Sequence, residues 1–230
     1  MKTIGLIGGL SWESSAEYYR LINEGVKARL GGLHSADCLM YSFDFAEIEH
    51  LQTTDAWDEA TARMVEAARH LERGGAACIV ICSNTMHRMA DDVQAAVDLP
   101  LIHIADSTAQ AIHSAGLNTI GLLGTIYTME QDFYKSRLVK HGLNVSIPDQ
   151  EQRQSVNRII YDELVLGVIK PESRTIYQSV IGDMAADSVQ GVILGCTEIG
   201  LLIKPEDSAI PTFDTTALHA AAAVDFALSE

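Results

Sequence analysis

Two short apolar runs end in residues that can handle a proton. The run 78–81 is followed by Cys-Ser-Asn-Thr at 82–85, and the run 191–194 is followed by Gly-Cys-Thr-Glu at 195–198. Each run is typical of a buried parallel strand, and open α/β sheets bind ligands at the C-terminal ends of such strands. The sequence therefore predicts two strand ends that present thiol and hydroxyl groups to a ligand.

The two halves of the chain repeat each other. Ile-Gly-Leu-Ile-Gly-Gly at 4–9 recurs as Ile-Gly-Leu-Leu-Gly-Thr at 120–125, and Ser83 and Cys196 follow in the same order at nearly the same offset. Two motif pairs with matching offsets indicate a duplicated half. One active strand end from each copy would place a proton-handling group on either side of a cleft.

Strand and helix signals alternate along the chain, which is the pattern of parallel sheets covered on both faces. We predict an α/β protein with two pseudo-symmetric lobes, each a parallel sheet flanked by helices, and an active site in the cleft between them. The first lobe should comprise residues 1–99 plus 209–230, and the second residues 100–208. The C-terminal segment is assigned to the first lobe because an apolar-faced helix, predicted over 215–228, should pack back on that lobe.

Local signals predict several individual helices. Ser14 or Ser15 should cap a helix that ends before Gly31, since serine is a common first residue and glycine a common stop. Further helices are predicted over 86–97, 129–140 and 151–166.

Composition limits the classes of partner. The chain of 230 residues has a formal net charge of −15, so neither nucleic acid nor an anionic membrane is an expected partner. Four cysteines in a chain of this length do not suggest a disulfide framework. No apolar stretch approaches the roughly 18 to 20 residues that cross a bilayer. We expect a reduced, cytoplasmic protein.

Cys196 is the foremost candidate for a catalytic base. Backbone N–H groups at a helix start would stabilise its thiolate and lower its pKa. At the other strand end, Cys82 and Ser83 are neighbours and must face opposite sides, so only one of them can meet the ligand. Asn84 and Thr85 add an amide and a hydroxyl that can hold a carboxylate.

Other ligand classes lack their motifs. Gly8 and Gly9 could cradle an anion, but the chain has no G-x-G-x-x-G fingerprint after this strand and no phosphate-binding G-x-x-x-x-G-K-[ST]. No Cys/His spacing resembles a zinc site. We therefore expect neither a cofactor nor a metal. His87 could orient a group in the cleft, or be a partly exposed histidine without such a role. His103 is expected to be a strand histidine whose ring nitrogens are hydrogen-bonded within the protein.

Several motifs together resemble the aspartate/glutamate racemase family of cofactor-independent amino-acid racemases. They are Gly-Gly-Leu-Ser-Trp-Glu at 8–13, Cys-Ser-Asn-Thr-Met-His at 82–87, Gly-Thr at 124–125 and Val-Ile-Leu-Gly-Cys-Thr-Glu-Ile at 192–199. The resemblance spans essentially the whole chain. It implies a homodimer of two-lobed subunits, in which two residues, usually cysteines, face opposite sides of the α-carbon of an amino-acid substrate.

The chain departs from the usual family pattern at one catalytic position. Ser83 stands where the first cysteine normally precedes Asn-Thr, so the resemblance implies a Ser83/Cys196 pair, with Cys196 as base and Ser83 as donor or relay. A backbone bulge that turns Cys82 inward is the rival arrangement. By position, the residues expected to line the cleft are Leu10, Ser11, Gln52, Asn84, Thr85, Thr125, Thr197 and Glu198.

The expected activity is racemisation of aspartate or glutamate, kinetically biased in one direction. The alternatives are a sister chemistry, such as a hydantoin racemase, maleate isomerase or decarboxylase, and a non-catalytic amino-acid-binding protein.

Overall fold

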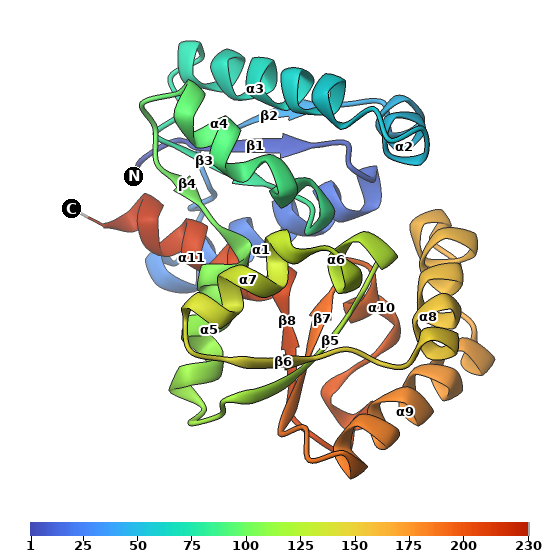
Figure 1. Cartoon of the computed structure of the whole chain (residues 1–230). Coiled ribbons are helices and arrows are strands. Elements are labelled where there is room, and N and C mark those ends of the chain that lie inside the picture. The colour runs from blue at the N-terminus through green and yellow to red at the C-terminus, as the bar shows by residue number, and fades with distance from the viewer. Residues whose placement is uncertain (230) are drawn as a thin grey trace. The chain divides into compact units, whose positions relative to one another are not determined.

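The computed structural model describes residues 1–229 and divides into two compact units (Figure 1). Unit 1 comprises Met1–His103 and the C-terminal stretch from His219, and unit 2 comprises Ile104–Leu218. Each unit contains a four-stranded parallel sheet flanked by helices, which confirms the predicted α/β class and its two similar halves.

The sheet of unit 1 has the strand order β2-β1-β3-β4. Its elements are β1 (Ile4–Gly8), α1 (Trp12–Leu30), β2 (Cys38–Ser42), α2 (Phe45–Thr53), α3 (Trp57–Arg73), β3 (Cys78–Ile81), the 3-10 turn η1 (Thr85–Met89), α4 (Ala90–Ala96) and β4 (Leu101–Ile102), with α11 (Thr215–Leu228) returning from unit 2. Every residue of β1 and β3 is buried, which explains why both read as continuous apolar runs.

Alternating side chains of the central strands of unit 1 pack on opposite layers. Leu6 and Val80 belong to an apolar cluster with Tyr18 of α1 and Val224 of α11, so these two helices cover one face (Figure 1). The C-terminal helix α11 therefore packs on the sheet of unit 1. α3 lies against the other face, where a Cβ added to Gly5 would meet the Leu71 side chain.

Unit 2 repeats the strand order of unit 1, as β6-β5-β7-β8. Its elements are α5 (Ile104–Ser114), β5 (Thr119–Gly124), α6 (Ile126–Glu130), α7 (Asp132–Lys140), β6 (Asn144–Ser146), α8 (Gln150–Asp162), η2 (Leu164–Leu166), α9 (Pro171–Ala186), β7 (Gly191–Gly195), α10 (Ile199–Leu202), η3 (Pro205–Asp207) and β8 (Thr212–Asp214). The matching order is what a duplicated half predicts, with β5 and β7 in the places of β1 and β3.

The core of unit 2 lies on both faces of its sheet. Leu194 and Leu123 pack with α8 and α9, whereas Ile193 and Leu122 pack with α5 and α7. Consecutive strand residues therefore enter opposite layers, as the pleat requires. Across residues 1–229, no helix is both long and apolar enough to cross a membrane.

The chain passes between the units at His103 and at Leu218, whereas the sequence placed these passages at residues 99 and 208. Two short strands account for the difference. β4 pairs with β3 in unit 1, and β8 pairs with β7 in unit 2. β8 has only three residues and lacks a local strand signal, so the predicted boundary lies before it.

Several helix limits differ from those predicted. α1 is capped by Ser11, whose hydroxyl oxygen accepts from the Ser14 backbone N–H at 3.2 Å, so the prediction of a cap at Ser14 or Ser15 is wrong. The helices predicted over 86–97, 129–140 and 151–166 are each broken into two elements. The break between α6 and α7 lies at Gln131, whose backbone is extended with ψ 154°.

His219 ties α11 to the rest of unit 1. Its Nδ1 lies 2.8 Å from the Tyr18 hydroxyl, and its Nε2 lies 2.6 Å from the carbonyl oxygen of Ile102. A carbonyl oxygen can only accept, so Nε2 carries the hydrogen, and Nδ1 of the neutral ring accepts from Tyr18. Both side chains are fully buried, and burial lowers the pKa of His219 to about 4.

Acidification should therefore destabilise the protein through His219. Its folded pKa lies below the ordinary value near 6.5, so the unfolded chain binds the proton first, and stability is lost as the pH falls from about 6.5 to about 4. The loss should approach about 3 kcal/mol, measured by urea denaturation across this pH range. The variant His219→Gln should show a shallower pH dependence, and an unchanged slope would contradict the assignment.

Candidate active site

The loop after β1 places Leu10 and Ser11 at the C-terminal end of the unit 1 sheet. Gly9 has a φ of 70°, and a Cβ at this position would overlap the backbone of Phe43, so the loop can pass over the end of β2 only with glycine here. Leu10 is buried, and Ser11 is almost fully buried as the cap of α1. The loop is thereby held in one conformation beside β1.

Cys82 and Ser83 face different surroundings at the end of β3. Cys82 is fully buried in the apolar cluster of α1 and α11, and burial raises the pKa of its thiol far above the ordinary range. Ser83 is partly exposed, and its Oγ accepts from the Met86 backbone N–H over a long 3.4 Å. Of the two neighbours, Ser83 is thus the one with access to solvent.

The remaining predicted residues of unit 1 lie around η1. Asn84 and Thr85 begin this turn and are buried, with exposures of 3% and 6%. Gln52 comes from α2, and its side-chain amide donates to the Met86 sulfur at 3.2 Å. The structure therefore brings α2 and η1 together beside Ser83.

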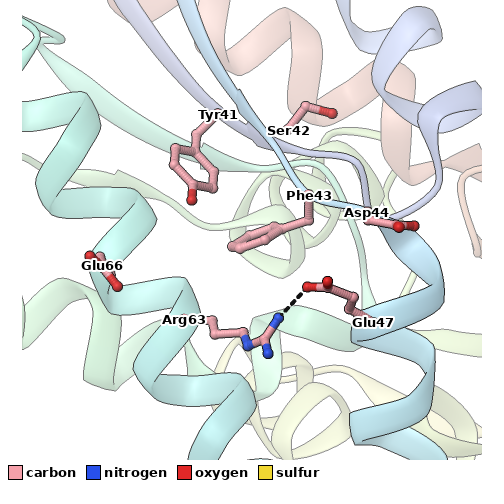
Figure 2. Close-up of a pocket in the computed structure, with 7 residues that line it drawn as sticks. All are labelled: Tyr41, Ser42, Phe43, Asp44, Glu47, Arg63 and Glu66. Atoms are coloured by element: carbon pink, nitrogen blue, oxygen red, sulfur yellow. Dashed lines mark hydrogen bonds and ion pairs between the residues drawn. The ribbon is translucent and has the colours of Figure 1, made fainter.

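A separate cavity of about 320 Å³ lies beside the end of β2 in unit 1 (Figure 2). Tyr41 and Phe43 extend toward α3, and Arg63 of α3 forms an ion pair with Glu47 of α2 at 2.6 Å. None of the side chains lining this cavity was predicted for the site. The cavity is acidic and polar, and its one lining cation, Arg63, is already paired.

In unit 2, the register of the sheet brings Thr125 and Cys196 next to each other. Gly124 of β5 pairs with Gly195 of β7, so the next residue of each strand emerges at the same edge. Thr125 caps α6, with its hydroxyl accepting from the Thr128 backbone N–H at 3.3 Å. A Cβ at Gly124 would meet the Gly195 carbonyl oxygen at 2.8 Å, so glycine allows this close approach.

Cys196 forms a hydrogen bond to a buried carboxylate. Its Sγ donates to Oε2 of Glu198 at 2.9 Å, and the Thr197 hydroxyl donates to the same oxygen at 2.6 Å. Glu198 is only 3% exposed, whereas Cys196 is partly exposed. The thiol thus has an adjacent proton acceptor within hydrogen-bond distance.

The pKa of the Cys196 thiol is raised well above its ordinary value. Burial is the largest cause, and the charge of Glu198 is the next, whereas the backbone N–H groups of Thr197 and Glu198 lower the pKa by less. The backbone N–H groups therefore act in the predicted direction, but the predicted net lowering of this pKa is wrong. The following helix, α10, is a single turn and is too short to outweigh a neighbouring carboxylate.

The structure thus groups the predicted residues at the C-terminal ends of the two central strands of each sheet, with Gln52 added from α2 in unit 1. Sequence reasoning missed the contact of Glu198 with Cys196, although the motif Cys-Thr-Glu carried both residues. It also missed His219, which lies in an apolar-faced helix without a local signal. Among residues 1–229, no three His, Cys, Asp or Glu side chains are arranged to hold a metal ion.

Comparison with known proteins assigns the chain to a family. The sequence profile described as Asp/Glu/Hydantoin racemase matches residues 7–223. The chain belongs to this family. All the residues predicted for the site, from Leu10 to Glu198, lie within the matched part.

Individual relatives match nearly the whole length of the chain. A crystal structure from Yersinia pestis, provisionally named an Asp/Glu racemase, is 56% identical and covers 100% of both chains with a TM-score of 0.93. An aspartate racemase homologue from Pyrococcus horikoshii OT3 is 35% identical, covers 100% of both chains and has a TM-score of 0.87. The broad specificity amino-acid racemase RacX of Bacillus subtilis strain 168 is 23% identical over 96% of each sequence.

Replacing Glu198 should release the Cys196 thiol from its raised pKa. In Glu198→Gln the neighbouring negative charge is lost while burial remains, so the pKa of the Cys196 thiol should fall. Alkylation of Cys196 by iodoacetamide, followed by peptide mass spectrometry, should reach half its maximal rate at a lower pH. The buried Cys78 and Cys82 in the same samples are internal controls, and an identical Cys196 profile in both proteins would refute the role of Glu198.

Proposed function

We propose that this protein racemises an acidic amino acid, aspartate or glutamate, by moving its α-hydrogen without a cofactor. The observation that carries the proposal is the hydrogen bond from Cys196 to Glu198 at the end of β7. Ser83 follows β3, which holds the same place in the strand order of unit 1. Family membership and the amino-acid racemase among the relatives support the same chemistry.

Cys196 and Glu198 supply the base. Glu198 takes the proton of the Cys196 thiol, and the resulting thiolate removes the α-hydrogen from the face of the substrate turned toward it. The S–H bond forms again, and the electron pair of the broken C–H bond stays on the α-carbon. A thiolate is needed because the thiol itself is not a base, and a buried carboxylate at 2.9 Å is placed to generate it.

Ser83 supplies the proton for the opposite face. Its hydroxyl protonates the α-carbon. Solvent then returns a proton to the serine oxygen and takes one from Glu198, which restores the starting state. Cys82 is a poor donor because its thiol is fully buried in the apolar core. We therefore favour the Ser83/Cys196 pair over the Cys82/Cys196 pair.

The two directions should differ kinetically. A hydroxyl is a far weaker base than a thiolate near neutral pH, so kcat should be smaller for the enantiomer whose α-hydrogen faces Ser83. The two free enantiomers have equal free energies, so kcat/KM is the same in both directions, and the bias is confined to kcat and KM separately.

Substrate binding is assigned to the polar groups at the starts of the helical turns. N–H groups and hydroxyls there can hold the α-carboxylate and the charge that develops on the α-carbon. The residues proposed for this role at the helix starts are Ser11, Asn84, Thr85, Thr125 and Thr197. The backbone N–H of Leu10, before α1, and the side-chain amide of Gln52, near the end of α2, are added to them, whereas Glu198 serves as the partner of Cys196.

Proton NMR in D₂O tests the proposal directly. Wild-type protein should remove the α-proton signal of at least one enantiomer of aspartate or glutamate and produce the other enantiomer. Cys196→Ala should lower both exchange and inversion by at least about a hundredfold, because the thiolate base is lost. Ser83→Ala should lower inversion similarly, yet still exchange the enantiomer that faces Cys196 with retention of configuration.

The controls separate the alternatives. Cys38→Ala removes a thiol outside the proposed site and should leave both rates unchanged. Absence of exchange with the L and D enantiomers of both aspartate and glutamate would exclude the proposed activity. Binding without exchange would indicate an amino-acid-binding protein. Turnover of hydantoins or maleate alone would indicate a sister chemistry.

A further inference from the structure

Three buried histidines of unit 1 form a contiguous cluster next to Ser83. The centroid of the His87 ring lies 4.6 Å from that of His103 and 5.4 Å from that of His219. Their exposures are 3%, 5% and 0%. Burying three imidazole rings together costs free energy unless their nitrogens find hydrogen-bond partners within the protein.

His87 holds the backbone of Ser83. Its Nδ1 lies 2.6 Å from the Ser83 carbonyl oxygen, which can only accept, so the ring donates an N–H to it. The C=O and the following N–H of a trans peptide point in opposite directions. The hydrogen bond from the His87 ring to the Ser83 carbonyl oxygen therefore directs the Asn84 N–H away from His87. The first N–H groups of a helical turn likewise point out of the turn, without a partner within it.

The other two rings of the cluster hold His87 in place. The His87 ring packs against His219 in an edge-on arrangement and against His103 at a tilt of 59°. His219 is itself fixed, since its two ring nitrogens are taken by the Tyr18 hydroxyl and the Ile102 carbonyl oxygen. A chain of contacts thus runs from α1 and α11 to the peptide between Ser83 and Asn84.

We propose that His87 is a positioning residue that orients the Ser83–Asn84 peptide, so that the Ser83 hydroxyl and the Asn84 N–H meet the substrate together. This inference rests on the proposed racemisation and concerns only the Ser83 half of it. His87 touches no reacting atom in this assignment. It acts through the hydrogen bond to the Ser83 carbonyl oxygen.

A pair of matched variants separates the hydrogen bond from the packing. His87→Phe keeps an aromatic ring but loses the donor, whereas His87→Asn loses the ring but keeps a donor near the Nδ1 position. Inversion and exchange with retention are both followed by proton NMR in D₂O, starting from the enantiomer that faces Cys196. His87→Leu provides a second variant without a donor if His87→Phe does not fold.

In His87→Phe, inversion should fall by about tenfold, while exchange with retention stays within about twofold of wild type. His87→Asn should recover most of the inversion rate. General loss of structure would lower both rates together, so the ratio of inversion to exchange reports positioning.

Two results would overturn the inference: an unchanged ratio in His87→Phe, or no recovery in His87→Asn at equal thermal stability. Wild-type protein without any exchange would overturn the proposed function, and the inference with it. Wild-type exchange with an unaffected His87→Phe ratio would overturn the inference alone.

Discussion

Burial of the parallel strands on both faces is the constraint on which the rest of the structure depends. Every residue of β1, β3 and β7 is buried, so these strands have room only for apolar side chains and glycine along their length. Polar side chains can appear only where a strand ends and its neighbours no longer cover it. The fold therefore leaves the strand ends, with Ser83, Cys196 and the turns that follow them, as the places for the proposed chemistry.

Electrostatics at Cys196 opposes a resting thiolate. Burial and Glu198 keep the thiol protonated, so the free protein does not expose a reactive thiolate. The same carboxylate is the nearest acceptor for that proton. A chain with a net charge of −15 thus places one of its many carboxylates in hydrogen-bond contact with the Cys196 thiol.

The sequence predicts the elements that carry a repeated pattern, and it does not predict the features that depend on individual tertiary contacts. The apolar runs and the recurring Ile-Gly-Leu motif identify the central strands of both sheets, and Gly31 ends α1 as predicted. The three-residue strand β8 and the break at Gln131 have no local signal, because pairing and packing decide them. The contact between Cys196 and Glu198 depends on side-chain rotamers, and the role of His219 depends on residues more than a hundred positions away.

The return of α11 to unit 1 has a consequence for synthesis on the ribosome. Ala220, Ala223, Val224 and Ala227 complete the apolar cluster over β1 and β3, yet they are made only after all of unit 2. At a synthesis rate of roughly 5 to 20 residues per second, the face of β1 and β3 stays uncovered by α11 for on the order of ten seconds. Unit 2 is continuous in sequence and can fold while that face is still open, so the N-terminal half of the chain is the last to be finished.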